Sequence, residues 1–240
     1  MAHGNHVKED TPMTTPITEA LKERRAIRRY LPKPVPDDLL KEILAEARWA
    51  PSATNTQSTY VYVLSGEPFE QFKTELKMYS ESEVPEAPDL VNTRDMPPEL
   101  KARQEELFRT RMSFIAAEEA KMGIKPQDPP VPPLVAGAAI FGAPLVLVLA
   151  MPKIIGLPYG CFDAGMLAQS IALAAHVRGL GTCITGSNVR YAELLRKVLP
   201  GTDDKSFIVA IAMGYPDLEA PVNRFPRTRI PVDEFVTFVR

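Results

Sequence analysis

Apolar residues recur every three to four positions in several stretches of this chain, a spacing typical of amphipathic helices. The clearest stretch begins with Asp37 and Asp38, whose negative charge suits the first turn of a helix. Pro51 marks its end. The same periodicity predicts helices over residues 16–25, 37–50, 68–78, 98–121, 162–178 and 191–198.

Short runs of β-branched, aromatic and aliphatic residues predict strands instead. These runs occupy residues 59–64, 144–151, 182–184 and 207–213. Helices and strands do not alternate regularly along the chain, as they would in a doubly wound sheet. The order therefore predicts an α+β fold, with a single domain over residues 15–240.

Two segments are unusually apolar. Residues 134–151 carry no charge, but glycines and Pro144 interrupt them, so a buried strand fits their second half better than a membrane helix. Residues 162–178 are apolar on nearly every side of the predicted helix, which indicates a buried central helix. Because one sheet and one neighbouring helix rarely cover such a helix fully, a partner subunit is expected to cover the rest.

Composition excludes several classes of protein. Hydrophobic residues make up 45% and charged residues 24%, as in ordinary globular proteins. The formal net charge of -2 gives no strong field toward nucleic acid or an anionic membrane, so neither partner is expected.

The polar N-terminal residues 1–14 are expected to be disordered, and they lack the apolar core of a signal peptide. We therefore expect a cytoplasmic protein. The two cysteines, Cys161 and Cys183, lie in apolar surroundings and are expected to be buried free thiols. His176 is the one histidine outside the tail, so no zinc site built from histidine and cysteine is expected.

Two arginine clusters are candidates for an anion site. The sequence KERRAIRR carries Arg24, Arg25 and Arg28 at the end of the first predicted helix. Arg227 and Arg229 lie two positions apart in an extended segment, so their side chains point the same way. Guanidinium groups present rigid forks that fit phosphate. A solvated charged turn and a nucleic-acid contact stay open as alternatives, and the short patch weakens the second.

Two loops suit a flat ring next to the anion that the arginines would bind. The loop APSATNTQ, residues 50–57, offers hydroxyls, amides and backbone N–H groups to the edge of a heterocycle, although an ordinary polar turn has the same composition. In GLGTCITG, residues 179–186, the glycines allow the backbone to approach a ligand closely. The lysine of a P-loop is absent, and no G-x-G-x-x-G follows a strand, so neither nucleotide motif is indicated.

In this order and at these separations, the four motifs resemble those of the nitroreductase family, flavoproteins that reduce nitro groups and quinones with a nicotinamide donor. The resemblance covers about residues 16–64 and 141–239 and is nearest to the nitrobenzoate-reductase-like branch. It is carried by RRAIRRY, APSATNTQ, YGCFDAGMLAQSIALAAHVRGLGTCITG and GYP with RTRIPVDEFV. It implies a nitroreductase-like fold: a central mixed sheet flanked by helices, a long buried central helix, and a domain-exchanged homodimer whose residues 221–240 form an extended arm.

The resemblance also implies FMN at the homodimer interface, NADH or NADPH as the electron donor, and a small aromatic acceptor. Arg24, Arg227 and Arg229 would bind the flavin phosphate, and Arg25 and Arg28 would lie between the phosphate and the ring. The remaining implied contacts come from the polar loop of the other subunit and from the turn along the ring: Pro51, Ser52, Ala53, Asn55, Thr185 and Gly186. Ala26 belongs to the same site, where many members have serine, so one hydroxyl contact of the family is absent.

Residues 95–122 are predicted to form a variable helical lid that selects the acceptor. Phe108 and Met112 are its candidate substrate contacts, because aromatic and thioether side chains suit flat rings. The alternative is that this stripe simply packs on the body. The pattern demands no catalytic acid or base and no metal, because the flavin supplies the chemistry. Another FMN reaction, such as reductive dehalogenation or dehydrogenation, and a non-catalytic anion- or nucleic-acid-binding protein are the other functions to weigh.

Overall fold

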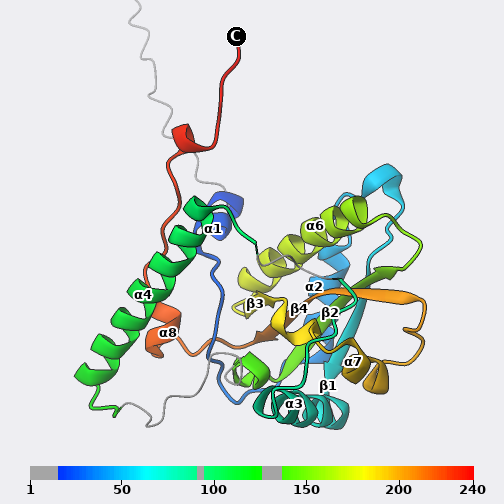
Figure 1. Ribbon diagram of the computed structural model, residues 1–240, viewed down its shortest axis with the longest axis horizontal. Helices are drawn as coiled ribbons and strands as arrows, with labels where there is room; N and C mark the ends of the chain where they lie inside the picture. Colours follow the sequence, from blue (N-terminus) through cyan, green and yellow to red (C-terminus); the bar gives the residue numbers. More distant parts are fainter. Residues whose placement is uncertain (1–15, 91–94, 126–136) are drawn as a thin grey trace, which may run out of the picture.

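The computed structural model describes residues 16–90, 95–125 and 137–240 (Figure 1). The helices are α1 (Pro16–Glu23), α2 (Asp37–Ala47), α3 (Gly66–Glu81), α4 (Pro98–Lys121), α6 (Leu157–His176), α7 (Ala192–Val198) and α8 (Pro221–Arg224). The strands are β1 (Tyr60–Ser65), β2 (Leu145–Pro152), β3 (Gly181–Thr185) and β4 (Lys205–Gly214). The predicted order of helices and strands is confirmed, whereas the expected tail of residues 1–14 lies outside the described residues.

The strands form one sheet in the order β1-β2-β4-β3, and every neighbouring pair is antiparallel. The expected mixed character is therefore wrong for the four named strands. A parallel element enters only as a bridge between Ala26 and Thr182, where the N–H of Ile27 donates to the carbonyl of Thr182 at 2.9 Å. The chain after α1 runs along the edge strand β3 for too few residues to form a fifth strand.

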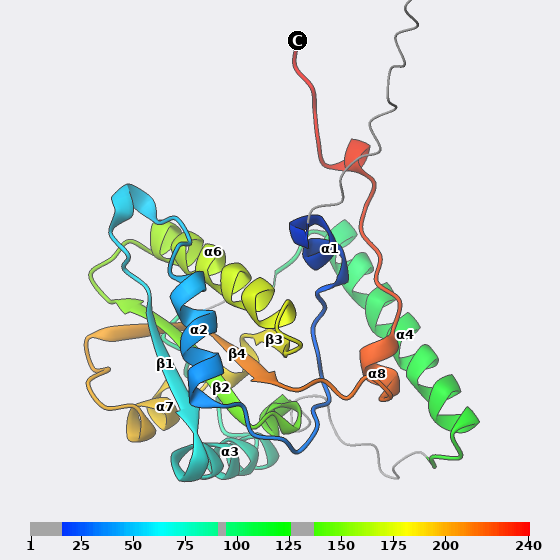
Figure 2. The same cartoon turned by 180° about the vertical axis from the view of Figure 1, so that it is seen from behind.

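Helices cover both faces of the sheet, with α2 and α6 on one side and α3 and α7 on the other (Figures 1 and 2). Side chains of a strand alternate between the two faces. In β2, one set of side chains packs with α3 and α7: Val146, Val148 and Ala150. The alternate set packs with α2 and α6: Leu145, Leu147 and Leu149. Burial on both faces explains why this strand is uniformly apolar.

The central helix α6 begins at Leu157, earlier than predicted, because Pro158 is compatible with the first turn of a helix. Residues 157–161, which the sequence did not assign to the helix, are therefore part of it. Only one face of α6 is buried within the chain. The opposite face leaves Tyr159, Phe162 and Val177 with 68%, 64% and 59% of their surface exposed. A single chain does not bury α6 on every side.

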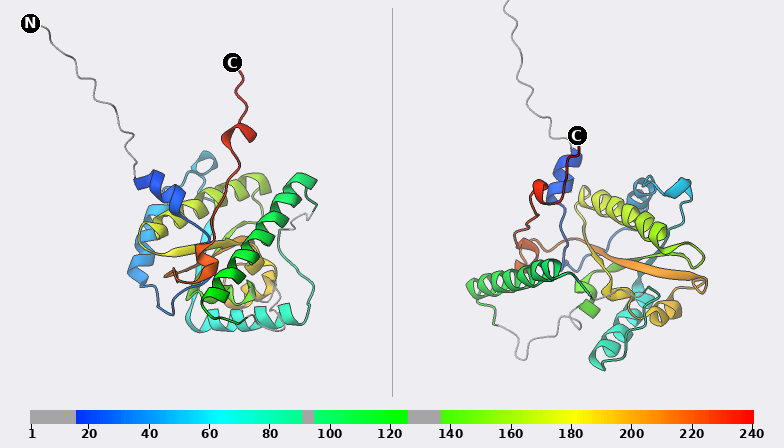
Figure 3. Two further views of the ribbon diagram at one scale, coloured as in Figure 1. Left: turned by 90° about the vertical axis from the view of Figure 1, so that its left-hand side faces the viewer. Right: turned by 45° about the horizontal axis from the view of Figure 1, so that its top comes forward.

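Helix α4 lies away from the sheet, beside α8 and the C-terminal segment (Figures 1 and 3). None of its described residues is buried, so the alternative that its apolar stripe packs on the body is not supported. Phe114 packs edge to face on Phe225, the residue directly after α8, with ring centroids 5.7 Å apart, and Glu118 forms an ion pair with Arg224 of α8 at 2.9 Å. The bounds of the lid and of the arm stay predictions.

None of the described helices is both long enough and apolar enough to cross a membrane. The second half of the apolar segment 134–151 is the strand β2, as predicted. Residues 134–136 of that segment lie outside the described residues.

Gly181 is required where the chain after α1 crosses β3. An added Cβ would lie 2.5 Å from Cγ1 of Ile27, a side chain that is 4% exposed. We expect Gly181→Ala to lower the free energy of unfolding by about 1–3 kcal/mol, the usual effect of overpacking, measured by urea denaturation. In the control Gly156→Ala the added Cβ meets nothing within 4 Å, and we expect a loss below about 1 kcal/mol. Equal losses in both variants would show that the close approach is unimportant.

Candidate functional site

Two segments far apart in the sequence line one cleft of about 1010 Å³. The first, residues 24–28, connects α1 to the edge of the sheet, and the second, residues 222–231, comprises part of α8 and the extended chain after it. The structure therefore brings together all the arginines predicted for the site, and Ala26 with them: Arg24, Arg25, Arg28, Arg227 and Arg229.

Asn223 joins these two segments, and the sequence analysis missed it. Its side chain is 2% exposed; it accepts a hydrogen bond from the N–H of Arg28 at 2.8 Å and donates to the carbonyls of Arg29 and Asp217 at 2.8 and 2.7 Å. Its own carbonyl accepts from Nη1 of Arg25 at 2.6 Å. In the sequence Asn223 is one polar residue in PVNRFP, and no local signal distinguishes it from a turn residue.

Arg227 has a different local role from Arg229. Both terminal nitrogens of Arg227 donate to backbone carbonyls, those of Arg24 and Lys22. Its guanidinium therefore holds the two segments together. Arg229 is exposed, with Nη1 donating to the carbonyl of Thr228 at 2.7 Å, so its remaining donors are accessible to a ligand.

Burial, and then the positive charge of Arg229, lower the pKa of Arg24. Burial lowers the pKa of Arg227 too, followed by the charges of Arg25, Arg229 and Arg24. In addition, Nε of Arg24 is buried with no hydrogen-bond partner. Like charges at close range disfavour one another, and an unsatisfied buried donor is costly. An anion with several oxygens, such as a terminal phosphate, would relieve both effects, so the cleft fits such a group.

The polar loop of residues 51–58 is held by Asp163, a second residue that the sequence analysis missed. Asp163 lies on α6 and is 3% exposed, and its carboxylate accepts from the N–H of Ala53 at 3.0 Å and from the hydroxyl of Ser58 at 3.5 Å. Within the loop, Ser52 Oγ accepts from the N–H of Gln57 at 2.9 Å. Asn55 has a φ of 57°, a left-handed conformation that asparagine tolerates. Pro51 and Asn55 are exposed.

The loop and the arginine cluster lie at opposite ends of α6 within one chain (Figure 1). Asp163 marks the loop end, and His176, which lines a second cavity of about 210 Å³ together with Arg24, marks the arginine end. At about 1.5 Å per residue, the thirteen steps between them span about 20 Å. The structure thus does not bring these two predicted parts of the site together in one chain.

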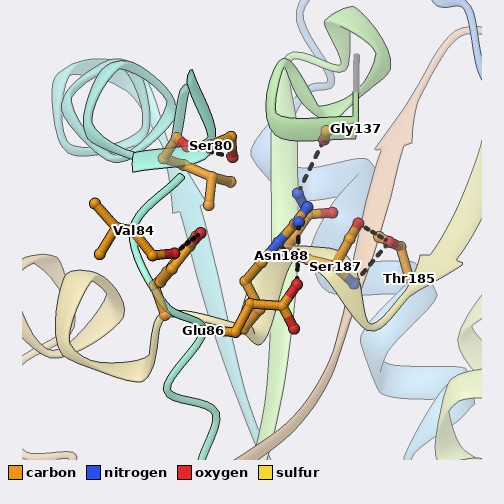
Figure 4. Close-up of polar contacts among 10 residues, drawn as sticks. Ser80, Val84, Glu86, Gly137, Thr185, Ser187 and Asn188 are labelled. Carbon is orange, nitrogen blue, oxygen red and sulfur yellow. Dashed lines mark hydrogen bonds and ion pairs between the residues drawn. The ribbon is translucent and has the colours of Figure 1, made fainter. Parts of the chain in front are cut away.

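Thr185 is the last residue of β3 (Figure 4), and Gly186 follows it at the start of the next turn. The hydroxyls of Thr185 and Ser187 lie 2.7 Å apart, and Asn188, 1% exposed, donates to the carbonyl of Gly137 at 3.2 Å. An added Cβ at Gly186 would meet nothing within 4 Å. The side chain of Thr185 is thus bonded within the turn, and Gly186 leaves its backbone open to a ligand. Neither residue lines the arginine cleft.

The two candidate substrate contacts on α4 are exposed, Phe108 by 44% and Met112 by 57%, and neither lines the cleft. The α4 residues that do line it include Leu107, Thr110 and Arg111. Helical spacing alone did not reveal which side of α4 faces the cleft.

The cysteines differ from the expectation in one respect. Cys183 is buried, but Cys161 is exposed, because it lies on the face of α6 that the chain leaves uncovered. Burial raises the pKa of the Cys183 thiol, while the nearby charges of Arg28 and Arg111 act in the opposite direction. Within the described ranges, no group of three or more metal-ligating side chains comes together.

The structure thus combines an α+β fold with an arginine-lined cleft at the edge of the sheet. The chain matches the nitroreductase family over residues 21–215, and it belongs to that family. It is 30% identical to a 4-nitrobenzoate reductase of Pseudomonas putida, over 90% of this chain and 92% of that protein. It is also 30% identical to a nitrobenzene nitroreductase of Ectopseudomonas oleovorans, over 95% of this chain and 99% of that protein.

Solved structures agree with this assignment. The FMN-dependent nitroreductase NfnB of Mycobacterium smegmatis, solved in complex with NADPH, superposes with a TM-score of 0.78 at 26% identity, covering 94% of this chain and 98% of that one. The FMN and NADPH-dependent NfnB of Sphigopyxis sp. strain HMH gives a TM-score of 0.78 at 28% identity, over 93% and 98% of the two chains.

Replacing Asn223 should loosen the junction of the two arginine segments. In Asn223→Ala the N–H of Arg28 and two backbone carbonyls lose their partners, so we expect a loss of about 2–4 kcal/mol in the free energy of unfolding, and faster tryptic cleavage after Arg227 and Arg229. Urea denaturation and limited proteolysis measure the two effects. The control is Thr56→Ala in the exposed loop, at a residue with a φ of -70°, where we expect less than about 1 kcal/mol. Unchanged stability and cleavage in Asn223→Ala would contradict the assigned role.

Proposed function

We propose that this chain is an FMN-dependent oxidoreductase that passes electrons from NAD(P)H to nitroaromatic or quinone acceptors. The observation that carries the proposal is the arginine cleft, in which a buried donor of Arg24 lacks a partner and like charges are crowded together. Family membership supports the same conclusion, since the two solved relatives are described as FMN-dependent and one contains NADPH.

The residues of the cleft would divide their work along the cofactor. Arg24 and Arg229 would bind the phosphate, because one has an unsatisfied donor and the other is exposed. Arg227 would contribute mainly by holding the two segments together. Arg28 would place positive charge beside the ring, where negative charge accumulates during reduction. FMN, when bound, supplies the hydride-accepting and electron-donating chemistry, and the protein supplies position and electrostatics.

A homodimer would complete the site. If two copies pack their α6 helices antiparallel through the exposed face around Phe162, the polar loop of one copy reaches the arginine end of the other. Pro51, Ser52, Ala53 and Asn55 would then contact the cofactor of the second copy, beside Thr185 and Gly186. The C-terminal segment supports domain exchange, because Phe235 and Phe238 are 65% and 70% exposed in the single chain.

The non-enzymatic alternative has less support. A nucleic-acid-binding surface needs a basic stripe along the molecule, whereas these arginines converge on one cleft in a chain of net charge -2. Another FMN reaction on the same fold would use the same cleft, and turnover with halophenols separates it from nitro reduction. A cytoplasmic location stays a prediction.

The first test is the cofactor itself. The purified protein should be yellow and release FMN, not FAD, on denaturation, because the cleft suits a terminal phosphate. Arg24→Ala and Arg229→Ala should each weaken FMN binding about 10- to 150-fold, the effect of one charge-assisted contact, measured by fluorescence titration of the apoprotein. Arg227→Ala should also lower the melting temperature, because it removes hydrogen bonds to Arg24 and Lys22.

The matched control is Lys101→Ala, an exposed cation on α4 that pairs with Glu105 on its own helix, where neither residue lines the cleft. It should bind FMN like the wild type. A colourless protein that gains no flavin spectrum with added FMN would refute the proposed function, and unchanged affinity in both cleft variants would refute the clamp alone.

The second test concerns the dimer. Light scattering should give twice the mass of one chain, and Phe162→Glu should shift the protein to monomer and weaken FMN binding together, because a charge would enter the apolar contact. Phe162 is 64% exposed in the single chain, so the variant should still fold. Met78→Glu, which changes a half-exposed residue of α3 in the opposite layer, is the control. A wild-type monomer that binds FMN fully would refute the shared site.

A further inference from the structure

Arg111 is a cation in the cleft wall whose charge no described residue neutralises. It lies on α4, contributes to the cleft wall with Leu107 and Thr110, and is partly buried. Its guanidinium carbon stands 4.9 Å from the centre of the Phe108 ring. Among the described residues it has no hydrogen bond or ion pair.

The acidic residues near Arg111 already have other partners. Glu106, which also lines the cleft, pairs with Arg109, and Glu118 pairs with Lys121 and Arg224. The largest electrostatic influence on Arg111 from another element is the repulsive charge of Arg28, with a smaller opposite influence from Cys183. Burial lowers the pKa of Arg111 most, and the charge of Arg28 lowers it further. A half-buried cation beside a second cation is costly unless an anion joins them.

The surroundings of Arg111 indicate what kind of anion fits. Leu107, one turn away on the same helix face, lines the cleft together with Arg111, and Phe225 and Ile230 add apolar and aromatic surface to the same cleft. Apolar and aromatic side chains around a guanidinium suit a flat ring that carries a planar carboxylate, which the guanidinium can bind with two hydrogen bonds. Arg24 and Arg229 also line the cleft, and the charge of Arg229 lowers the pKa of Arg24.

We propose that Arg111 is a specificity-determining residue that binds the negatively charged substituent of the acceptor, a carboxylate on an aromatic ring. The proposal rests on the proposed function and names the acceptor class for the same cleft. A phosphate of the nicotinamide donor has related chemistry, so the test includes both donors.

The test compares Arg111→Ala with the wild type as FMN-loaded enzymes, using 4-nitrobenzoate and the matched neutral 4-nitrobenzamide. Loss of a charge-assisted contact should lower kcat/KM for 4-nitrobenzoate about 10- to 150-fold and change the value for 4-nitrobenzamide by less than about 2-fold. Arg111→Lys should recover part of the activity, because it keeps the charge without the fork. Lys101→Ala, which removes an exposed cation of α4 whose partner Glu105 lies outside the cleft lining, should behave like the wild type with both acceptors.

The donor arm measures the rate of flavin reduction by NADPH and by NADH in the absence of acceptor. Both rates should be unchanged in Arg111→Ala. Selective loss with NADPH would assign the contact to the donor phosphate and overturn the proposal. Equal losses with the two acceptors would overturn it as well.

A binding readout separates this proposal from the proposed function. Titration with benzoate, which cannot be reduced, should shift the flavin absorbance of the wild type. Arg111→Ala should need at least about 10-fold more benzoate for the same shift. Benzamide should bind both proteins equally weakly. If the wild type contains FMN but reduces no nitro compound, the function fails while the benzoate result still decides the role of Arg111. Equal benzoate affinity in the two proteins overturns the proposal.

Discussion

The candidate site depends on the hydrogen bonds that hold two irregular chain segments together at the edge of the sheet. Ile27 pairs with Thr182 of β3, and Asn223 bonds to the backbone on both sides of the junction. These uncharged contacts oppose the repulsion among the arginines, which would otherwise separate the segments. These bonds are buried and are made mostly to backbone groups. They therefore fix the backbone positions of the arginines and leave part of the guanidinium surface accessible to a ligand.

The same site is assembled from elements of unequal rigidity. The sheet and α6 form a core packed on both faces, and β3 provides a firm edge. Helix α4 has no buried residue and is held mainly to α8, through Phe114 and Glu118. A wall with few buried contacts opens at lower free energy than the core. This arrangement suits a cleft in which a tightly bound cofactor stays while donor and acceptor exchange.

Helix α6 connects the site to assembly. Its buried face is used by the sheet and α2, while its other face exposes Phe162 and Val177. Its length keeps the loop held by Asp163 away from the arginine end in one chain. A second copy packed antiparallel would cover the apolar face of α6 and would also supply the loop at the arginine end.

The sequence by itself determined the elements and the chemistry of the site, because periodicity and arginine spacing are local properties. It predicted the uniformly apolar β2, the helix from Asp37, and the arginines that the structure gathers in one cleft. Only the tertiary structure decided the antiparallel pairing, the exposure of Cys161, and the side of α4 that carries Arg111 rather than Phe108 into the cleft wall. Asn223 and Asp163 were not predicted either, because their hydrogen-bond partners are distant in the sequence. Ser58 lies 105 positions from Asp163, and Arg28 lies 195 positions from Asn223. A buried polar residue acquires its role from such distant contacts, which no local pattern records.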